Sequence, residues 1–347
     1  MDSTRDVGRG WTEDVLAGVG RFLQLFFSKK REQMLGLSPS SVLLLDAVAD
    51  LTRRGGKRLR PMVLYAGARA TCARPNESSL WLAGAALEMM QTYLLIHDDW
   101  MDQDNERRGG RSVHAHFADL TENNHLGASL AVLAGDLASA FAWEVMSECL
   151  HHDPLQPELL SQFARMHQEV VMGQHQDIGK SDDVYRMYDL KTGSYTVRGP
   201  LLLGALLGGA HREQLASLEA IAYPLGIAFQ IRDDLLGTFG DRAVTGKPVG
   251  NDLRRGKFTA LIAEAKNLLN AEEFKGLDAL IHSSRVSEAN IKHWIHVLEN
   301  RGVRKRLEQK VQTLAEEAEM LLEHSPFDPT GRQFLNDIIH HLTHRYR

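Results

Sequence analysis

The stretch IHDDWMDQDNERRGGRSVHAHF, residues 96–117, joins an apolar segment to a dense group of acids and then to arginines. Asp98 and Asp102 are four residues apart and would therefore share one face of a helix. Unpaired carboxylates at this spacing repel each other, whereas a hard cation such as Mg²⁺ binds them favourably. A charge run of this kind is most often a solvated surface. The apolar residues before Asp98 instead favour a helix that leaves the core and delivers its carboxylates into a cavity.

A second pair of acids repeats this arrangement. In GIAFQIRDDLLGTFGD, residues 226–241, an apolar segment leads into Asp233 and Asp234. Two helices that end in carboxylates can direct them at one another across a helical bundle, which is how bundles form internal metal sites. Burying such carboxylates together without a cation would cost too much free energy. The two pairs therefore predict one shared site for several metal ions.

Basic residues flank both acidic pairs. They are Lys57, Arg58 and Arg60 in RRGGKRLRP (residues 53–61), Arg107 and Arg108 after the first pair, Lys191 in KTG (residues 191–193), and Lys247 and Lys257 after the second pair. A helix expected to begin near Pro61 would present its N-terminus, which attracts anions. A single basic residue is most often a surface group. Together with two acidic pairs, however, these residues indicate binding of a diphosphate with Mg²⁺.

Helical periodicity dominates the chain and predicts an all-α fold. Apolar residues recur three and four positions apart between Ala83 and Leu94, and again between Val303 and Leu321. No convincing series of alternating strands appears. Because no segment has the composition of a flexible linker, residues 1–347 are expected to form a single domain, a large helical bundle. Two smaller domains are the alternative.

The overall composition narrows the class of protein. The 347 residues carry a net charge of −5, which does not favour binding to nucleic acid. Cys72 and Cys149 are isolated, as in proteins of a reducing compartment. The N-terminal residues lack the pattern of a signal peptide, and no apolar run reaches the roughly 18 residues of a membrane span. We therefore expect a cytoplasmic protein without an integral membrane segment.

Several segments, taken in order, resemble the signature segments of the trans-isoprenyl diphosphate synthases. They are GGKRLRP, DDWMD followed by ERRGG, GQHQD, KTG, QIRDD and TGKPVGNDLRRGK, spread over about residues 53–257. The resemblance implies an all-α bundle around a deep central cavity, usually a homodimer, with three Mg²⁺ ions or Mn²⁺ in their place. It also implies head-to-tail condensation of isopentenyl diphosphate with an allylic diphosphate, which is dimethylallyl, geranyl or farnesyl diphosphate.

The resemblance assigns roles residue by residue. Asp98, Asp102 and Asp233 would bind the metal ions, and Asp99 and Asp234 would accept hydrogen bonds from metal-bound waters. Isopentenyl diphosphate would bind Gly56, Lys57, Arg60, Gln91 and Arg108. The allylic diphosphate would bind Arg107, Lys191, Lys247 and Lys257. Thr192 and Gln230 would lie against the reacting carbons, and Asp177 would orient Lys191 or Lys247. Catalysis would depend on Asp98, Asp102, Asp233, Lys191, Thr192 and Gln230.

Product length is expected to depend on the helix that carries Asp98. Leu94 is four residues upstream on the same face, and Tyr93 lies about 7.5 Å deeper than Asp98 along the helix axis. In the family, a bulky aromatic residue at the fourth position upstream stops growth at farnesyl diphosphate. Here the aromatic residue stands only at the fifth position. The resemblance therefore implies geranylgeranyl diphosphate as the main product, with Tyr93 as the pocket floor and Met90 as its support. Farnesyl diphosphate or a longer polyprenyl diphosphate is the alternative.

The sequence departs from the family pattern at two positions of interest. Gly237 stands where many members carry a third aspartate of the second motif, and Asp241 is nearby in the sequence. Trp100 is bulkier than the usual aliphatic residue, and we expect it to face the protein because it lies between the two metal-binding positions.

Two other functions are the alternatives. A terpene cyclase also carries an aspartate-rich helix, but it would not need Lys57, Arg60 and Arg108 for a second diphosphate. A helical Ca²⁺-binding scaffold would carry acidic loops with the EF-hand spacing, and the chain shows no such loop. His167, Glu169 and His175 are not expected to bind a metal because Glu169 lies off the face that the histidines share.

Overall fold

The computed structural model describes residues 4–150, 156–240, 250–283 and 286–343. Nearly all regular structure in these residues is helical, so the all-α prediction is confirmed. Their one hairpin pairs β1 (Glu106–Arg107) with β2 (Gly110–Arg111), directly after the first acidic motif.

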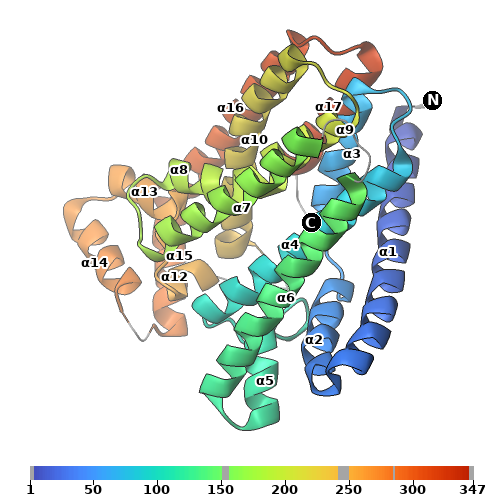
Figure 1. Ribbon diagram of the computed structural model, residues 1–347. Helices are drawn as coiled ribbons and strands as arrows, with labels where there is room; N and C mark the ends of the chain where they lie inside the picture. The colour runs from blue at the N-terminus through green and yellow to red at the C-terminus, as the bar shows by residue number, and fades with distance from the viewer. Residues whose placement is uncertain (1–3, 151–155, 241–249, 284–285, 344–347) are drawn as a thin grey trace.

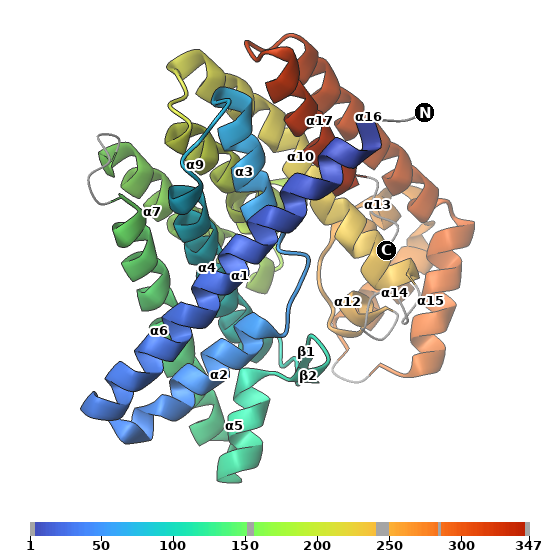
Figure 2. The same cartoon turned by 90° about the vertical axis from the view of Figure 1, so that its right-hand side faces the viewer.

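The N-terminal half consists of long helices. They are α1 (Thr4–Leu37), the 3₁₀ turn η1 (Pro39–Ser41), α2 (Val42–Arg53), α3 (Leu59–Thr71), α4 (Glu77–Met101), α5 (Val113–Thr121) and α6 (Asn124–Leu150). Figures 1 and 2 place α4 inside the bundle, with α1 and α6 packed against it.

The C-terminal half continues with α7 (Gln156–Ile178), α8 (Val184–Tyr188), the π-helical segment η2 (Asp189–Arg198), α9 (Gly199–Leu207) and α10 (Arg212–Phe239). It ends with α12 (Asn251–Arg254), α13 (Ala260–Leu268), α14 (Ala271–Ile281), α15 (Glu288–Asn300), α16 (Val303–Glu323) and α17 (Pro329–Thr343). In Figure 1, α12 to α15 lie together on one side of the bundle, next to the end of α10.

The central helix α4 leads the first acidic motif out of the core. Asn76 caps its N-terminus by accepting a hydrogen bond from the Ser79 amide. Between Leu80 and Ile96 most residues are buried in a cluster shared with α1, α2, α6 and α7. A helix that is apolar on all sides belongs inside a bundle. The last turn of α4, which starts at Asp98 and Asp99, therefore extends beyond the apolar core.

The second acidic motif lies at the end of another core helix, α10. His211 and Gln214 form a capping box at its first turn and so satisfy its free amide groups. From Leu225 to Ile231 every side chain except that of Gln230 is buried. α10 packs against α16 on one side and η2 on the other. This packing holds Asp233 and Asp234 at the end of a rigid element.

Two described helices, α4 and α6, are long and apolar enough to cross a membrane when judged by length and composition alone. This result does not overturn the sequence-based expectation of no integral membrane segment, because a buried core helix passes the same test of length and composition. In α4 the apolar window is 72% buried inside the protein, as in a core helix, whereas in α6 only 39% is buried. The exposed side of α6 thus leaves an apolar surface for which the fold of one chain provides no cover.

Helices α3 and α9 approach each other unusually closely. A Cβ atom on Gly204 would lie 1.8 Å from the Leu64 carbonyl oxygen, and one on Gly67 would lie 2.2 Å from the Leu201 carbonyl oxygen. Both neighbours are backbone atoms, so they cannot turn away as a flexible side chain can. Glycine at both positions is therefore a requirement of this contact.

Gly204→Ala should lower the free energy of unfolding by about 1–3 kcal/mol or more, because the added methyl group forces the two backbones apart. Gly20→Ala is the matched control. Gly20 lies inside α1, where a Cβ atom would meet nothing within 4 Å. This change should stabilise by about 0.5–1 kcal/mol through helix propensity. Denaturant unfolding of both variants checks the prediction, and equal effects would contradict it.

Candidate active site

Both acidic motifs open onto one cavity of about 290 Å³. Among the described residues its lining includes seven aspartates, which are Asp98, Asp102, Asp104, Asp177, Asp233, Asp234 and Asp252. Five basic residues line it as well: Arg60, Arg107, Lys191, Arg255 and Lys257. The ends of α4 and α10, far apart in the sequence, therefore meet at a common site, as the two acidic pairs predict.

Lysines hold the carboxylates on the α4 side. Lys191 Nζ lies 3.2 Å from Asp98 Oδ1 and 2.5 Å from Asp177 Oδ2. Lys257 Nζ lies 2.5 Å from Asp102 Oδ2. Burial raises the pKa of Asp98, but Lys191, Lys257 and Arg107 lower it further and hold it well below its usual range. Asp98 therefore stays ionised in the cavity wall.

Asp99 points away from the cavity and binds an arginine. It is fully buried, and Arg107 Nε donates a hydrogen bond of 2.7 Å to Asp99 Oδ1. Burial raises the pKa of Asp99 to about 6, against the opposing effect of Arg107. Asp99 Oδ2 has no hydrogen-bond partner among the described residues. Asp99 thus positions Arg107, which lines the cavity, while Asp99 itself does not.

A chain of hydrogen bonds joins the α10 side to η2. Thr192 Oγ1 donates to Gln230 Oε1 at 2.6 Å, and Gln230 Nε2 donates to Asp234 Oδ1 at 2.8 Å. Tyr188 donates its hydroxyl proton to Asp234 and accepts a hydrogen bond of 2.7 Å from the Ala260 amide. Burial, together with the charge of Asp252, raises the pKa of Asp234. Asp233, one residue earlier, is exposed and faces the cavity.

Glycines allow η2 to carry Lys191 and Thr192 into this position. A Cβ atom on Gly173 would lie 2.2 Å from the Lys191 amide nitrogen, so only glycine lets α7 approach η2 here. On the other side, a Cβ atom on Gly226 would lie 2.8 Å from Gly193 Cα. Irregular π-helical turns are frequent at functional sites. Gly173 of GQHQD and Gly226 of α10 are therefore packing residues that let η2 bring Lys191 and Thr192 to the cavity.

A group of arginines lies beside the cavity near the start of α3. Arg60 Nη2 donates to Thr196 Oγ1 at 2.7 Å, and its guanidinium lies over the Tyr195 ring, 4.3 Å from the centroid. A Cβ atom on Gly56 would meet the Arg108 guanidinium at 2.9 Å, so these two residues are in contact. Burial and the charges of nearby arginines lower the pKa of Arg108. An excess of positive charge of this kind suits a polyanion.

The residues assigned to isopentenyl diphosphate do not all line this cavity. Arg60 and Gln91 do, and Gln91 Oε1 is buried without a hydrogen-bond partner among the described residues. Gly56, Lys57 and Arg108 are absent from its lining, and the Lys57 side chain is exposed.

An apolar pocket of about 290 Å³ adjoins the charged cavity. The two share Leu95, Asp98, Lys191 and Tyr195 in their linings. Tyr93 and Leu94 line the apolar pocket, whereas Met90 is fully buried and does not line it. The apolar pocket therefore adjoins the carboxylates and is lined largely by residues of α4 and α7.

Sequence reasoning missed several residues of the cavity. Arg255 Nη1 donates to the Asp102 carbonyl oxygen at 2.7 Å and also pairs with Asp104. Asp252 lies next to Gly237, where a Cβ atom would be 3.2 Å from Asp252 Oδ2. The carboxylate of Asp252 thus lies close to where a third aspartate of the second motif would begin. Asp252 and Arg255 belong to TGKPVGNDLRRGK, so the motif identified the segment but not these two side chains.

Two further expectations need comment. Trp100 does not face the protein: it is 41% exposed and lines a surface groove with Met101 and Ile178. This expectation was wrong because the side of α4 opposite Asp98 and Asp102, on which Trp100 lies, is partly open to solvent at the last turn of the helix. Lys247 and Asp241 lie outside the described residues.

The side chains of the cavity fit Mg²⁺. The aspartates offer oxygen atoms only, and hard cations such as Mg²⁺ prefer oxygen ligands. Histidine and cysteine, which favour zinc and other softer metals, are absent from the described part of the lining. The aspartates also outnumber the five basic residues, which favours the binding of cations. Lysines and arginines hold Asp98 and Asp102, whereas Asp233 remains exposed.

A charged cavity that opens into an apolar pocket defines a class of protein: helical enzymes that act on diphosphates with hydrocarbon tails. The polar part suits the diphosphate, and the pocket suits the tail.

Comparison with known proteins identifies the family. Residues 41–298 match the polyprenyl synthetase family. A geranylfarnesyl diphosphate synthase from Aeropyrum pernix is 30% identical over 88% of this chain and 95% of its own length. A farnesyl diphosphate synthase from Haemophilus influenzae is 32% identical over 71% and 82%. The crystal structure of a geranylgeranyl pyrophosphate synthase from Corynebacterium glutamicum, complexed with isoprenyl diphosphate and magnesium, superimposes with a TM-score of 0.86, at 30% identity, over 96% and 98% of the two chains.

The chain therefore belongs to the polyprenyl synthetase family, the trans-isoprenyl diphosphate synthases, and is a prenyltransferase of isoprenoid biosynthesis.

Proposed function

We propose that this enzyme condenses isopentenyl diphosphate head-to-tail with dimethylallyl, geranyl and farnesyl diphosphate in turn, and that its main product is geranylgeranyl diphosphate. The observation that carries this proposal is the junction of two spaces: the cavity with its aspartates, and the apolar pocket that Tyr93 and Leu94 line. Magnesium in the Corynebacterium glutamicum synthase supports Mg²⁺ as the ion, with three ions proposed and Mn²⁺ as a substitute.

The residues of the cavity act on the allylic diphosphate. Asp98 and Asp102 on α4 and Asp233 on α10 would hold the metal ions, which supply positive charge to the departing diphosphate. Lys191, Lys257 and Arg107 turn their cationic groups into the same space and would bind the diphosphate oxygens. Fixed positive charge at a developing anion lowers the barrier for breaking its carbon–oxygen bond. Lys247 stays a proposed ligand on sequence resemblance alone.

The arginine group provides the second substrate site. Arg60 and Gln91 line the cavity, Arg108 lies close to the cavity-lining Arg60 and Arg107, and Gly56 contacts Arg108. Lys57 stays a proposed ligand on sequence resemblance alone. Isopentenyl diphosphate bound there would place its double bond beside the allylic carbon, near Thr192 and Gln230. Holding both reactants in this orientation replaces a bimolecular encounter and contributes much of the rate enhancement. The adduct then loses a proton, for which the released diphosphate is the proposed acceptor.

The second substrate site also argues against a terpene cyclase. A cyclase releases diphosphate from an allylic substrate alone, whereas the proposed enzyme needs isopentenyl diphosphate. Diphosphate release measured with and without isopentenyl diphosphate distinguishes the two. Diphosphate release that does not depend on isopentenyl diphosphate would overturn the proposal.

Asp98→Ala and Asp233→Ala should each lower the rate of condensation by about a hundredfold or more, since each removes a proposed metal ligand. The thermal unfolding midpoint should change little. Asp46→Ala is the control, because Asp46 is an exposed acid that pairs with Arg31 on the surface. Incorporation of isopentenyl diphosphate measures the effect. Activity above about a tenth of wild type in either variant would contradict the ligand assignment.

The product-length proposal predicts opposite effects of two neighbouring substitutions. Tyr93→Ala should lengthen the main product by at least one five-carbon unit because it removes the ring at the pocket floor. Leu94→Phe should shorten it, since a ring would then fill the pocket one residue nearer Asp98. Mass spectrometry of the products, with each allylic primer, provides the measurement. The same product length in wild type and both variants would exclude this floor, but not the family.

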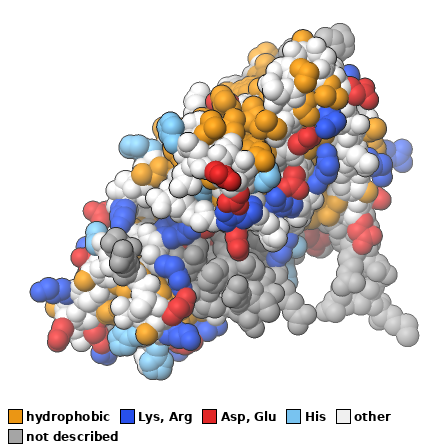
Figure 3. Space-filling view, turned by 90° about the horizontal axis from the view of Figure 1, so that it is seen from below, with side chains coloured by type: hydrophobic (Ala, Val, Ile, Leu, Met, Phe, Trp, Pro, Cys, Tyr) orange, Lys and Arg blue, Asp and Glu red, His pale blue; other side chains and the backbone are white. Residues whose placement is uncertain are grey.

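We further propose a homodimer formed through α5, α6 and the adjoining end of α7. Figure 3 shows hydrophobic side chains gathered over one area of the surface. The exposed large apolar residues of these helices are Leu120, Leu126, Leu133, Val171, Met172 and Ile178. A contiguous apolar surface of this kind typically marks a protein interface. A second copy is the occupant favoured here, because closed two-fold dimers are the commonest assembly of soluble enzymes.

Leu133→Asp should convert the dimer into a monomer, because it would bury two unpaired carboxylates in a symmetric interface. Met320→Asp is the control, since Met320 is equally exposed, at 56% against 53% for Leu133, but lies on α16. Analytical ultracentrifugation measures both. A monomeric wild type, or a Leu133→Asp variant that stays dimeric, would reject this interface.

The proposed location in the cytoplasm agrees with the two free cysteines, Cys72 and Cys149.

A further inference from the structure

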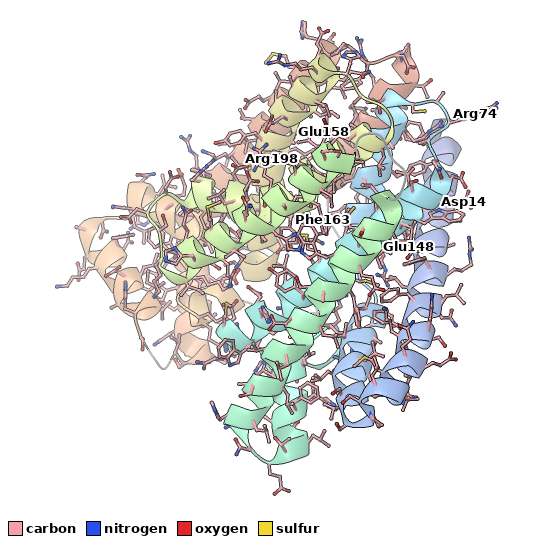
Figure 4. All side chains as sticks on the ribbon, viewed as in Figure 1. Asp14, Arg74, Glu148, Glu158, Phe163 and Arg198 are labelled. Carbon is pink, nitrogen blue, oxygen red and sulfur yellow. The ribbon has the colours of Figure 1, made fainter. Side chains whose placement is uncertain are left out.

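The floor residue Tyr93 rests on a column of aromatic rings from two other helices. The Tyr93 ring is stacked on His167 of α7, with the centroids 5.9 Å apart and an angle of 8° between the planes. His167 is stacked in turn on Trp143 of α6, at 5.1 Å and 29°. Phe163, labelled on α7 in Figure 4, packs edge-on against His167 at 4.7 Å and against Trp143 at 4.8 Å.

The rings follow one another away from the apolar pocket. Tyr93 lines the pocket and is 9% exposed, whereas His167 and Trp143 do not appear in its lining. His167 therefore lies between Tyr93 and Trp143. Removing the Tyr93 ring would not open the pocket to free space. It would uncover the flat face of a second ring, held from behind by a third.

His167 serves here as a ring rather than as a charged group. Its Nδ1 atom lies 3.0 Å from the Phe163 carbonyl oxygen, one turn earlier in the same helix. Its Nε2 atom is buried without a hydrogen-bond partner among the described residues. Burial lowers the pKa of His167, which keeps the imidazole neutral. A neutral imidazole with one nitrogen unsatisfied gains its stability from stacking, so it is a packing element.

We propose that His167, backed by Trp143, forms a second floor of the product pocket and limits product length together with Tyr93. This inference rests on the proposed chain-elongation function. The second floor also replaces Met90 with His167 as the residue that supports the Tyr93 ring. Met90 is fully buried in the same core, but the ring contacts lead from Tyr93 to α7 and α6 rather than further down α4. Product length is then set by α4, α6 and α7 together and not by α4 alone.

The test compares product lengths of Tyr93→Ala, His167→Ala and the double variant. His167→Ala alone should leave the wild-type product dominant because Tyr93 still closes the pocket. The double variant should extend the product by at least one five-carbon unit beyond that of Tyr93→Ala. The ratio of this longer product to the product of Tyr93→Ala should rise about tenfold or more, which is the range that steric differences in apolar pockets produce. Equal product lengths in Tyr93→Ala and the double variant would overturn the second floor.

A matched substitution separates the ring from a general loss of structure. In the Tyr93→Ala background, His167→Phe keeps a ring at the same place and should keep the product of Tyr93→Ala. Lengthening by His167→Phe equal to that by His167→Ala would also overturn the proposal. Should the double variant fail to fold, Tyr93→Ala with His167→Val retains apolar packing and should still lengthen the product.

Failure of the proposed function would look different from failure of this inference. If wild type did not incorporate isopentenyl diphosphate into any allylic primer, the elongation function itself would be rejected. If isopentenyl diphosphate is incorporated normally but product length does not change with the residue at position 167, only the second floor is rejected.

Discussion

The pairing of Lys191 and Lys257 with the aspartates of α4 and α7 is the interaction on which the site depends. Seven aspartates lining one cavity would repel each other strongly if they were left unpaired. Lys191 bridges Asp98 and Asp177, and Lys257 bridges Asp102 and Asp177. These two ammonium groups hold α4, α7 and the segment after α12 around a common centre. The close glycine contacts of η2 are needed because Lys191 reaches this centre only if η2 lies against α7.

The same constraint explains why the chain is arranged as two core helices with polar ends. An apolar helix such as α4 can be buried on every side until its last turn, and the charged residues then meet solvent or each other in the cavity. The π-helical segment η2 differs from this pattern. Its wider turns place Lys191 and Tyr195 on the walls of both the charged cavity and the apolar pocket. One short element thus lines both spaces that are proposed to bind the two ends of a diphosphate substrate.

Residue spacing predicted the all-α class and the meeting of Asp98, Asp102 and Asp233 at one cavity. These predictions succeeded because helical periodicity is a local property of the chain and because short motifs contain the side chains that the chemistry needs. Spacing could not predict Asp252 beside Gly237, the Arg255–Asp104 pair, or Tyr188 between Asp234 and Ala260. Each of these contacts joins segments far apart in the sequence. Trp100 lies on the side of α4 opposite Asp98 and Asp102, and spacing alone does not show that this side is partly open to solvent.

The aromatic column behind Tyr93 shows the same limit. The proposed floor residue on α4 follows from its distance to Asp98 along the helix, but nothing local in the sequence connects Tyr93 with His167 or Trp143. The spacing of His167 and His175 only argues against a metal site. Its stacking depends on how α6 and α7 cross α4, which is a property of the whole bundle.

The lysine–aspartate pairs would make binding of the proposed cation and diphosphate cooperative. A divalent ion bound alone by Asp98 and Asp102 would leave the ammonium groups of Lys191 and Lys257 without these partners. A diphosphate bound alone would have the same carboxylates as repelling neighbours. With both ligands bound, the carboxylates would pair with the ion and the ammonium groups with the diphosphate. By thermodynamic linkage, each ligand would then raise the affinity of the other by the same factor.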